Sequence, residues 1–395
     1  MIPPDVLAAL RDQRRPVCAY VYDLDVAHRT VDAVRAALPP GALLLYAVKA
    51  NSHPGVVAAL ARHVDGLEVA SGGELELAAG TGASTIVFGG PAKTDAELSA
   101  AVAAGALVHA ESLLELRRLA AVAGGDRAGA GAGDRCVRVA LRVNRAGVDL
   151  AGSHRMTGVP TQFGIDEAAL GDAVALVREL PALRLVGFGL HAVSNNLDAV
   201  AHAAYVADAL DWSVAAARRL GVPLEYVNVG GGLGLDYAGD KRFDLDALRA
   251  GLAGMRVPRG VTLAFEPGRF LVASAGWYAA EVLDLKRTHG RWFAVLRGGT
   301  HHFRLPAAWG YSHPAVVVPV EDWPYPFERP EVRDAHVDVV GELCTPRDVL
   351  ARELRVDRLR VGDVLVFGNT GGYGWDISHR DFLRHPYPQI VLIGE

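Results

Sequence analysis

Cysteine is scarce in this chain of 395 residues, and the three cysteines present, Cys18, Cys136 and Cys344, lie far apart. Their odd number and the lack of any Cys-x-x-Cys spacing exclude a disulfide framework and a zinc knuckle. We therefore expect a protein without a bound metal that works in a reducing compartment.

Long apolar runs and an excess of charge of either sign are also absent. The amino-terminal stretch MIPPDVLAALRDQRRP has no apolar run of signal-peptide length, and no run of about 18 apolar residues follows it. A formal net charge of -5 with 22% charged residues gives no sign of binding to nucleic acid or to a membrane surface. The composition predicts a soluble cytoplasmic enzyme with neither as a partner.

Short apolar runs alternate with Ala/Leu/Arg-rich helical stretches between about residue 40 and residue 270, which is typical of βα units around a parallel sheet. The eight runs are Leu43–Val48, Leu67–Val69, Thr85–Phe88, Leu107–His109, Val137–Val143, Leu185–Leu190, Tyr226–Val229 and Leu263–Glu266. The helices between them include Pro54–His63, Glu74–Ala79 and Ala199–Leu220. Eight such units predict an α/β fold with a closed, TIM-like (β/α)8 barrel.

After Gly268 the pattern changes to runs that are broken by Pro and Gly and have no long helices between them. These runs are Trp277–Leu285, Trp292–Leu296, Ala315–Pro319, His336–Val340 and Val364–Phe367. They predict a second, mainly antiparallel β domain over residues 271–395, after a barrel over residues 29–270. Residues 1–28 are expected to join the β domain through a strand at Cys18–Leu24.

A glycine-rich segment at Gly124–Gly133 superficially suggests a phosphate-binding loop. It follows a helix and precedes a strand, which is the reverse of the order that such loops need. We therefore predict only a solvent-exposed connection there.

Two charged residues stand where barrel strands end, at the face that carries active sites in this fold. Lys49 lies among small and apolar residues, which would desolvate its ammonium as a Schiff-base amine requires, although a strand-end lysine can simply reach solvent. Glu266, in the run Glu266-Pro-Gly-Arg, can pair with a pyridine nitrogen and keep it protonated. An ion pair with Arg269 is the structural alternative.

Further candidates follow other strands. Gly230, Gly231 and Gly232 form a turn after the seventh strand, where barrels often bind phosphate, although such turns also serve purely conformational needs. His191 can stack on a cofactor ring or be a satisfied core residue, and Ser194 can donate a hydrogen bond to a phosphate.

The predicted β domain holds three more candidates. Cys344 and Asp348 can reach a neighbouring subunit's pocket, although a buried and inert cysteine is the alternative. Tyr373, on a glycine turn, can donate to a phosphate oxygen or pack as an ordinary aromatic residue.

In this order, the segments resemble the fold-type III pyridoxal-phosphate decarboxylases, which include the diaminopimelate, ornithine and biosynthetic arginine decarboxylases. The matching segments are Tyr46–Asn51, Val69–Leu75, Gln162–Ile165, His191–Ser194, Gly230–Gly232, Glu266–Arg269, Cys344–Asp348 and Gly372-Tyr373. The resemblance spans nearly the whole chain and implies pyridoxal 5'-phosphate as the cofactor.

The resemblance also implies roles for individual residues. Lys49 would hold the cofactor, His191 would stack on its ring, and Glu266 would pair with the ring nitrogen. The phosphate would be held by Ser194, the glycine triplet, the backbone at Gly268 and Arg269, and Tyr373. Cys344 would come from the partner of an obligate homodimer and return a proton to the substrate.

Departures from the family pattern concern the substrate. Thr345 stands where the amino-acid decarboxylases usually carry a carboxylate that binds a distal ammonium. The family's Arg-Pro-x-x-Tyr segment corresponds to Leu305 through Trp309, with Arg304 one place away. We expect Thr345, Asp348, Arg304 and Trp309 to line the substrate site.

Three other segments are similar to a narrower branch, the decarboxylases of carboxylate-type siderophore assembly: Phe88–Lys93, His191–Asp198 and residues 309–314. The implied substrate is a citryl-diaminopropionate conjugate. Diaminopimelate is the alternative substrate, ahead of ornithine and arginine. An amino-acid racemase is disfavoured because the Glu266 carboxylate would keep the pyridine nitrogen protonated, which makes the cofactor ring a strong electron acceptor. A cofactor-free regulatory binding protein is disfavoured because the residues expected to hold the cofactor are retained.

Overall fold

The computed structural model describes residues 2–125 and 136–395, which form two compact units. The barrel unit contains residues 30–235 and 241–270, and the β unit contains the residues up to 29 together with 236–240 and 271–395. The domain boundaries expected from the sequence, after residues 28 and 270, stay a prediction. Most of the glycine-rich connection predicted at Gly124–Gly133 lies outside the described residues.

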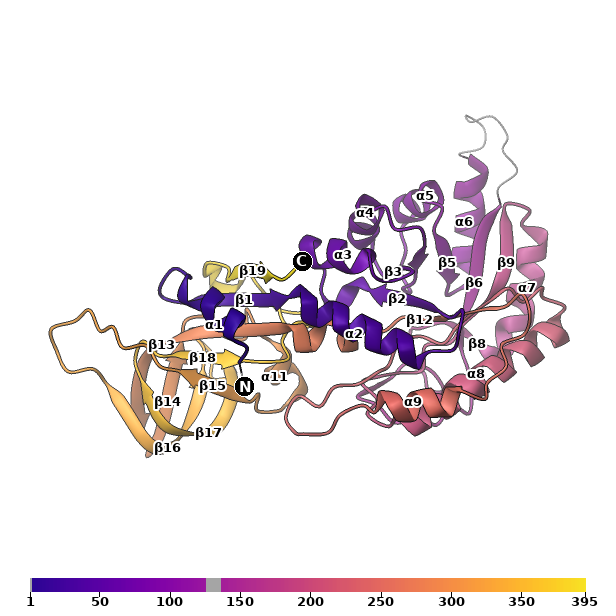
Figure 1. Ribbon diagram of the computed structural model, residues 1–395. Helices are drawn as coiled ribbons and strands as arrows, with labels where there is room; N and C mark the ends of the chain where they lie inside the picture. The colour runs from indigo at the N-terminus through magenta and orange to yellow at the C-terminus, as the bar shows by residue number, and fades with distance from the viewer. Residues whose placement is uncertain (1, 126–135) are drawn as a thin grey trace. The chain divides into compact units, whose positions relative to one another are not determined.

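The barrel unit is built on a closed ring of parallel strands (Figure 1). The strands are β2 (Leu43–Ala47), β3 (Gly66–Val69), β4 (Ile86–Phe88), β5 (Leu107–Ala110), β6 (Val137–Asn144), β9 (Leu183–Gly189), β11 (Tyr226–Asn228) and β12 (Thr262–Phe265). Pairing of β12 with β2 and of β5 with β6 completes the ring, so the predicted (β/α)8 barrel is confirmed. The short strand β8 (Ile165–Asp166) pairs in parallel with the end of β6.

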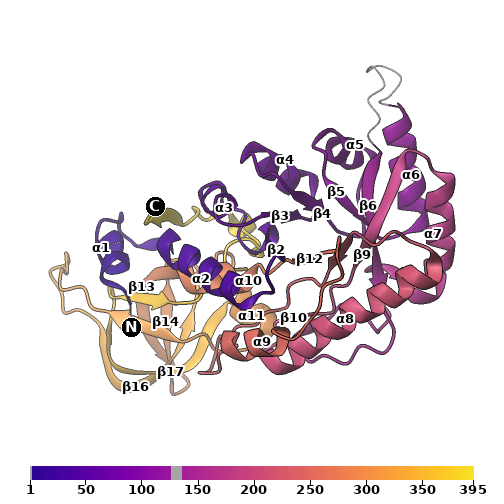
Figure 2. The same cartoon turned by 45° about the vertical axis from the view of Figure 1, so that its right-hand side comes forward.

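Helices follow most barrel strands and lie outside them; Figure 2 shows α6, α7 and α8 beside β6 and β9. The helices are α2 (Leu24–Ala37), α3 (Pro54–Ala61), α4 (Gly72–Gly80), α5 (Asp95–Ala103), α6 (Leu113–Gly125), α7 (Leu170–Glu179), α8 (Ala199–Leu220), α9 (Leu245–Leu252) and α10 (Arg269–Val272). Buried side chains from different strands, such as Leu45, Val87 and Tyr226, fill the barrel interior. The barrel is therefore a packed core with its chemistry at one end.

The β unit contains one large, mostly antiparallel sheet, as predicted. Its strands are β1 (Cys18–Asp23), β13 (Gly276–Thr288), β14 (Arg291–Leu296), β15 (Ala315–Val318), β16 (Glu331–Val340), β17 (Val349–Arg360), β18 (Val364–Phe367) and β19 (Gln389–Ile393). The pairs β1–β19 and β14–β16 are parallel, and the other pairs are antiparallel. The amino-terminal segment joins this sheet through β1, which pairs with β13.

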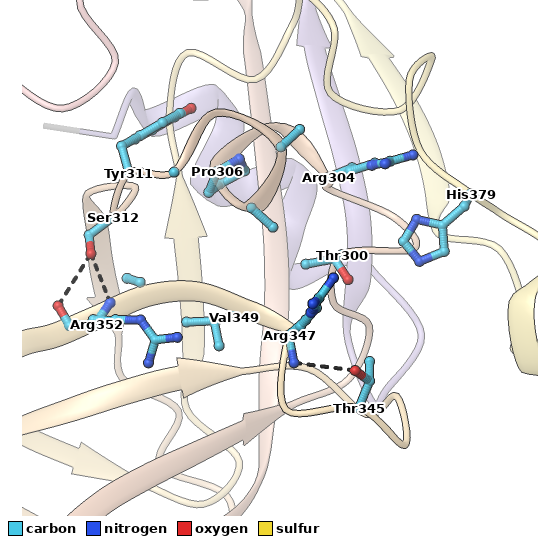
Figure 3. Close-up of a pocket in the computed structure, with 14 residues that line it drawn as sticks. Thr300, Arg304, Pro306, Tyr311, Ser312, Thr345, Arg347, Val349, Arg352 and His379 are labelled. Carbon is cyan, nitrogen blue, oxygen red and sulfur yellow. Dashed lines mark hydrogen bonds between the residues drawn. The ribbon is translucent and has the colours of Figure 1, made fainter.

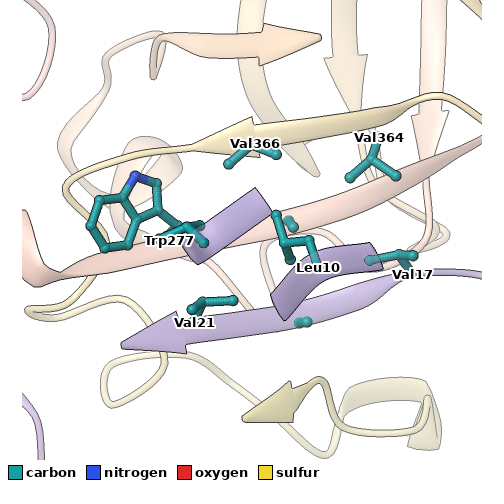
Figure 4. Packing of buried hydrophobic residues seen from close by; sticks show 9 residues of the cluster. Leu10, Val17, Val21, Trp277, Val364 and Val366 are labelled. Atoms are coloured by element: carbon teal, nitrogen blue, oxygen red, sulfur yellow. The ribbon is translucent and has the colours of Figure 1, made fainter. Parts of the chain in front are cut away.

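A hydrophobic cluster fixes the amino-terminal segment in the β unit (Figure 4). Helix α1 (Pro4–Arg11) places Leu10 one turn after Val6, and both side chains are buried. They pack with Val21 of β1 and Val366 of β18.

Across the part of the chain that the structure describes, no helix has the length and apolarity needed to cross a bilayer.

Candidate active site

Lys49 lies in a short 3-10 turn, Val48–Ala50, directly after β2. The amide of Ala47 donates to the carbonyl of Pro267 across 3.4 Å, which joins the end of β2 to the segment that follows β12. A Cβ on Gly268 would lie 3.0 Å from the carbonyl oxygen of Ala47, so only glycine allows this close approach. The turn therefore holds Lys49 at the same barrel end as Glu266.

Glu68, on β3, is the partner of Lys49 and was not predicted from the sequence. The Lys49 ammonium donates to the Glu68 carboxylate. The Lys49 side chain is 40% exposed, whereas that of Glu68 is 7% exposed. The Lys49 side chain is therefore partly exposed, and its ammonium is held by a buried carboxylate.

Glu266, the residue after β12, carries a carboxylate in an unfavourable electrostatic setting. Burial and the negative charge of Glu68 raise its pKa to about 7, against the opposing effects of Lys49 and Arg142. Its Oε2 accepts a hydrogen bond of 3.0 Å from Asn228. A cationic group brought to this carboxylate would relieve the penalty of ionising it.

His191 and the glycine triplet form one hydrogen-bonded turn. Gly231 donates its amide to Nδ1 of His191 across 3.3 Å, and Gly230 donates to Oδ1 of Asn228 across 2.7 Å. Burial, followed by the nearby charges of Arg142 and Lys49, holds the pKa of His191 well below its usual range. The imidazole is therefore neutral, with Nδ1 as the acceptor.

The glycine turn requires glycine at more than one position. Gly230 and Gly232 have φ of +81° and +94°, and a Cβ on Gly230 would lie 2.3 Å from Nδ1 of His191. A Cβ on Gly231 would lie 2.6 Å from the carbonyl oxygen of Glu266. The triplet thus packs its backbone closely against His191 and Glu266, which a side chain at Gly230 or Gly231 would prevent.

A small cavity at the strand ends brings several of these groups together. It is lined by Glu68, Gly89, His109, Arg142, Gly189, Leu190, His191, Asn228 and Glu266. Arg142 is held by Glu111 at 2.9 Å. Nε2 of His109 is buried and has no hydrogen-bond partner among the described residues. Among residues 2–125 and 136–395, no group of three or more His, Cys, Asp or Glu side chains is arranged to hold a metal ion.

A second lysine of the barrel, Lys93, is fully committed elsewhere. Its side chain is 1% exposed and donates to Glu115 at 2.7 Å and to the carbonyl groups of Gly90 and His109. Of the chain's four lysines, Lys49 is thus the one whose amine lies beside the acidic pair Glu68 and Glu266.

A lysine amine, a buried carboxylate and a glycine-rich turn at one end of a barrel are the parts that a phosphate-bearing aldehyde cofactor needs. The family model described as the pyridoxal binding domain of pyridoxal-dependent decarboxylases matches residues 24–273. The chain belongs to the pyridoxal-dependent decarboxylases.

Relatives of this decarboxylase share both units. The 2-[(L-alanin-3-ylcarbamoyl)methyl]-2-hydroxybutanedioate decarboxylase of Staphylococcus aureus is 40% identical over 99% of this chain and 97% of its own length. The diaminopimelate decarboxylase of Pseudomonas fluorescens is 32% identical over 95% of this chain and 88% of its own. The structure of Helicobacter pylori diaminopimelate decarboxylase with L-lysine superposes with a TM-score of 0.84 at 23% identity, covering 98% of this chain and 94% of that one.

The barrel residues fit pyridoxal phosphate. The raised pKa of Glu266 would fall if a ring N–H faced it, and the Lys49 amine lies at the same barrel end. Gly230 and Gly231 already donate their amides to Asn228 and His191, so in this decarboxylase the two glycines first allow the turn to pack against those side chains. Phosphate contacts by the triplet, by Ser194 on β10 (Val193–Ser194) and by Arg269 stay predictions.

The predicted residues of the β unit divide into two kinds. Cys344 is a free, exposed thiol, which removes the alternative of a buried inert cysteine. Asp348 is 2% exposed, and its carboxylate accepts the amides of Thr300 (2.6 Å) and Leu343 (2.9 Å). Asp348 therefore fixes the loop that carries Cys344, and its direct contact with substrate stays a prediction.

Arg304 and Thr345 line a common cavity of the β unit, whereas Trp309 packs edge-on against Tyr237 with ring centroids 5.7 Å apart. Tyr373 has φ of +57° in the segment after β18 and is partly buried. The sequence motifs thus identified residues of both units, while Glu68, Asn228 and Arg142 emerged only from the structure.

Proposed function

We propose that this chain removes the α-carboxylate of 2-[(L-alanin-3-ylcarbamoyl)methyl]-2-hydroxybutanedioate, the amide of citrate with the side-chain amine of 2,3-diaminopropionate. The observation that carries the proposal is the 40% identity with the staphylococcal enzyme of that name over 99% of the chain, so that both units are matched. The product would be a citryl-ethylenediamine unit for carboxylate siderophore assembly, made in the cytoplasm.

The substrate end of the site supports this choice over diaminopimelate. Leu305 is fully buried, so the position that carries the family's recognition arginine offers no polar group. Thr345 supplies a hydroxyl where related enzymes use a carboxylate to hold a distal ammonium. Burying the distal charges of diaminopimelate without those partners would cost several kcal/mol.

Bound pyridoxal phosphate supplies an electron sink for the pair that remains at the α-carbon when carbon dioxide leaves. Glu68 holds the Lys49 ammonium and orients the amine toward the barrel mouth. Neutral His191 offers an uncharged ring face beside the glycine turn at residues 230–232. Glu266, fixed by Asn228, presents a negative charge to a ring nitrogen and so keeps a proton there.

A screen of carbon dioxide release tests the substrate. Purified enzyme loaded with cofactor is given citryl-diaminopropionate, meso-diaminopimelate, ornithine or arginine at equal concentration. We expect kcat/KM for the citryl compound to exceed that for each of the others by at least about 100-fold, because a buried distal charge without its partner costs several kcal/mol and about 2.7 kcal/mol already gives that factor. Preference for diaminopimelate, or a racemised product without carbon dioxide release, would refute the assignment.

We propose further that the enzyme is a homodimer in which each barrel site is completed by Cys344 of the other chain, which returns a proton to the substrate. The exposure of this thiol on a loop fixed by Asp348 supports the proposal. A closed C2 arrangement would give two equivalent sites.

Mixing two inactive variants tests this sharing of sites. After Lys49→Ala and Cys344→Ala proteins are denatured together and refolded, half of the dimers contain both chains, and each of these has one intact site. Activity should recover to about one quarter of the wild-type value. Lys49→Ala mixed with Glu266→Gln is the matched control, since both changes lie in the barrel and no intact site can form. Equal activity in the two mixtures would show that sites are not shared.

A further inference from the structure

The β unit contains a cavity of about 660 Å³ that the roles proposed above leave mostly unassigned. Figure 3 shows it between helix α11 (Leu305–Trp309) and the segment that leads into β17. It is lined by Thr300, Arg304, Pro306, Ala307, Ala308, Gly310, Tyr311, Ser312, Thr345, Arg347, Val349, Ala351, Arg352 and His379. A cavity of this size is large enough for a small organic ligand.

The charged side chains that line this cavity are all positive. Three arginines contribute to the lining, and none of the lining residues is acidic. In the described part of the chain, no carboxylate forms an ion pair with Arg304 or Arg347. Arg352 has only a long contact with Asp338, at 3.7 Å, and Asp338 is already paired with Arg291 at 2.6 Å. The cavity therefore presents unneutralised guanidinium groups.

The remaining polar groups do not offset that charge. Burial and the positive charge of Arg304 lower the pKa of His379, which keeps its ring neutral at pH 7. The Thr345 hydroxyl accepts the amide of Arg347 at 3.3 Å, so a neutral group stands where a carboxylate would pair with the arginines. In Figure 3 the Arg347 side chain extends toward Thr300 and that of Arg304 toward His379.

We propose that this cavity binds the two carboxylates at the citrate end of the substrate through Arg304, Arg347 and Arg352, an assignment that rests on the proposed function for the identity of the substrate. Guanidinium forks bind carboxylates with two parallel hydrogen bonds, and a hydroxybutanedioate offers two carboxylates without an ammonium. The far end of ornithine or arginine is a cation, and that of diaminopimelate carries an ammonium beside its carboxylate, so each would bring a positive charge among three cations. The cavity thus selects substrates by charge.

The chain connects this cavity with the reacting bond. Thr345 and Arg347 follow Cys344 in a single loop, which Asp348 holds through the amide of Leu343. A contact that brings the Cys344 thiol to a barrel site therefore also brings Arg347 there, so that one loop contacts both the reacting end and the citrate end of the substrate.

Two measurements on the cofactor-loaded enzyme test the inference. The first is the ratio of kcat/KM for citryl-diaminopropionate to that for β-N-acetyl-diaminopropionate, which keeps the amide but lacks both carboxylates. Arg347→Gln, and more strongly Arg304→Gln/Arg347→Gln, should lower this ratio at least tenfold. The second is calorimetric titration with citrate, whose affinity should fall at least tenfold in the same variants.

Arg355→Gln is the matched control, because Arg355 is an exposed arginine of the same strand as Arg352 but does not line the cavity. It should keep both the ratio and the citrate affinity of the wild type. Yellow colour and an unchanged melting temperature would verify folding and cofactor loading of every variant.

The outcomes separate this inference from the proposed function. If the wild type releases carbon dioxide from the citryl substrate but the arginine variants keep its ratio and its citrate affinity, the cavity assignment is overturned and the proposed function stands. If the wild type is inactive on that substrate, the proposed function fails, and the citrate titration alone tests whether the cavity is a dicarboxylate site. Arginine-dependent binding then supports a dicarboxylate site, whereas arginine-independent binding or none overturns it.

Discussion

Lys49→Ala should yield a colourless protein whose decarboxylation rate is at least about four orders of magnitude below that of the wild type, the scale of loss when a covalent catalyst loses its nucleophile. Glu68 holds the Lys49 ammonium, and Lys93 cannot replace it because its own ammonium is buried against Glu115. Visible absorbance after loading with cofactor, and carbon dioxide release, measure the two effects.

Lys286→Ala is the control for loss of a lysine, since Lys286 is about half exposed on β13 and pairs only with Asp284 among the described residues. It should remain yellow and fully active. A Lys49→Ala protein that keeps both its colour and its rate would show that another group holds the cofactor.

Glu266→Gln should lower kcat by about 100-fold to 1000-fold, the range found when one preorganised electrostatic partner is removed from an active site. The amide keeps the volume of the side chain, but it cannot offer a negative charge to a ring nitrogen. Glu225→Gln is the control, because Glu225 is exposed, pairs with Arg184 and lies just before β11 rather than after it. An unchanged kcat in Glu266→Gln would contradict the proposed role of the carboxylate.

The same variant has a pH signature without cofactor. A carboxyl with a pKa of about 7 in the folded protein and 4.5 in the unfolded chain binds more protons when folded, so its contribution to stability falls as the pH rises from about 4.5 to about 7. The melting temperature of the wild-type apoprotein should therefore fall relative to that of Glu266→Gln across this window. A constant difference would mean that the carboxyl is not held in an unfavourable setting.

The barrel was readable from the sequence because its parallel strands are buried on both faces and appear as unbroken apolar runs, such as Leu43–Ala47 and Tyr226–Asn228. Strand β17 was missed for the opposite reason. It is long and rich in charge, and its alternation is interrupted where Glu353 adopts φ of +51° beside irregular pairing with β16. Strand β19 was missed because its place beside β1 depends on a pairing across almost the whole chain.

The candidate residues that follow strands could be predicted because the barrel places the carboxyl ends of its strands at one face. Lys49, His191 and Glu266 were predicted in this way, and the structure places them near one group of charged side chains. Glu68 lies inside a short apolar strand and faces inward, so no periodic pattern distinguishes it before the register of β3 is known. Arg304 and Thr345, which line the arginine cavity, were predicted for the substrate site, whereas Arg347 and Arg352 emerged only from the structure.

The central claim is that the Lys49 amine holds pyridoxal phosphate, and trapping it chemically is the most direct test. The loaded enzyme is reduced with borohydride, which fixes the cofactor to the amine that carries it, and the digested protein is mapped by mass spectrometry. We expect one modified peptide, the one containing Lys49, with Lys93, Lys241 and Lys286 unmodified. Modification of one of those lysines in its place, or a protein left without any fixed cofactor, would contradict it.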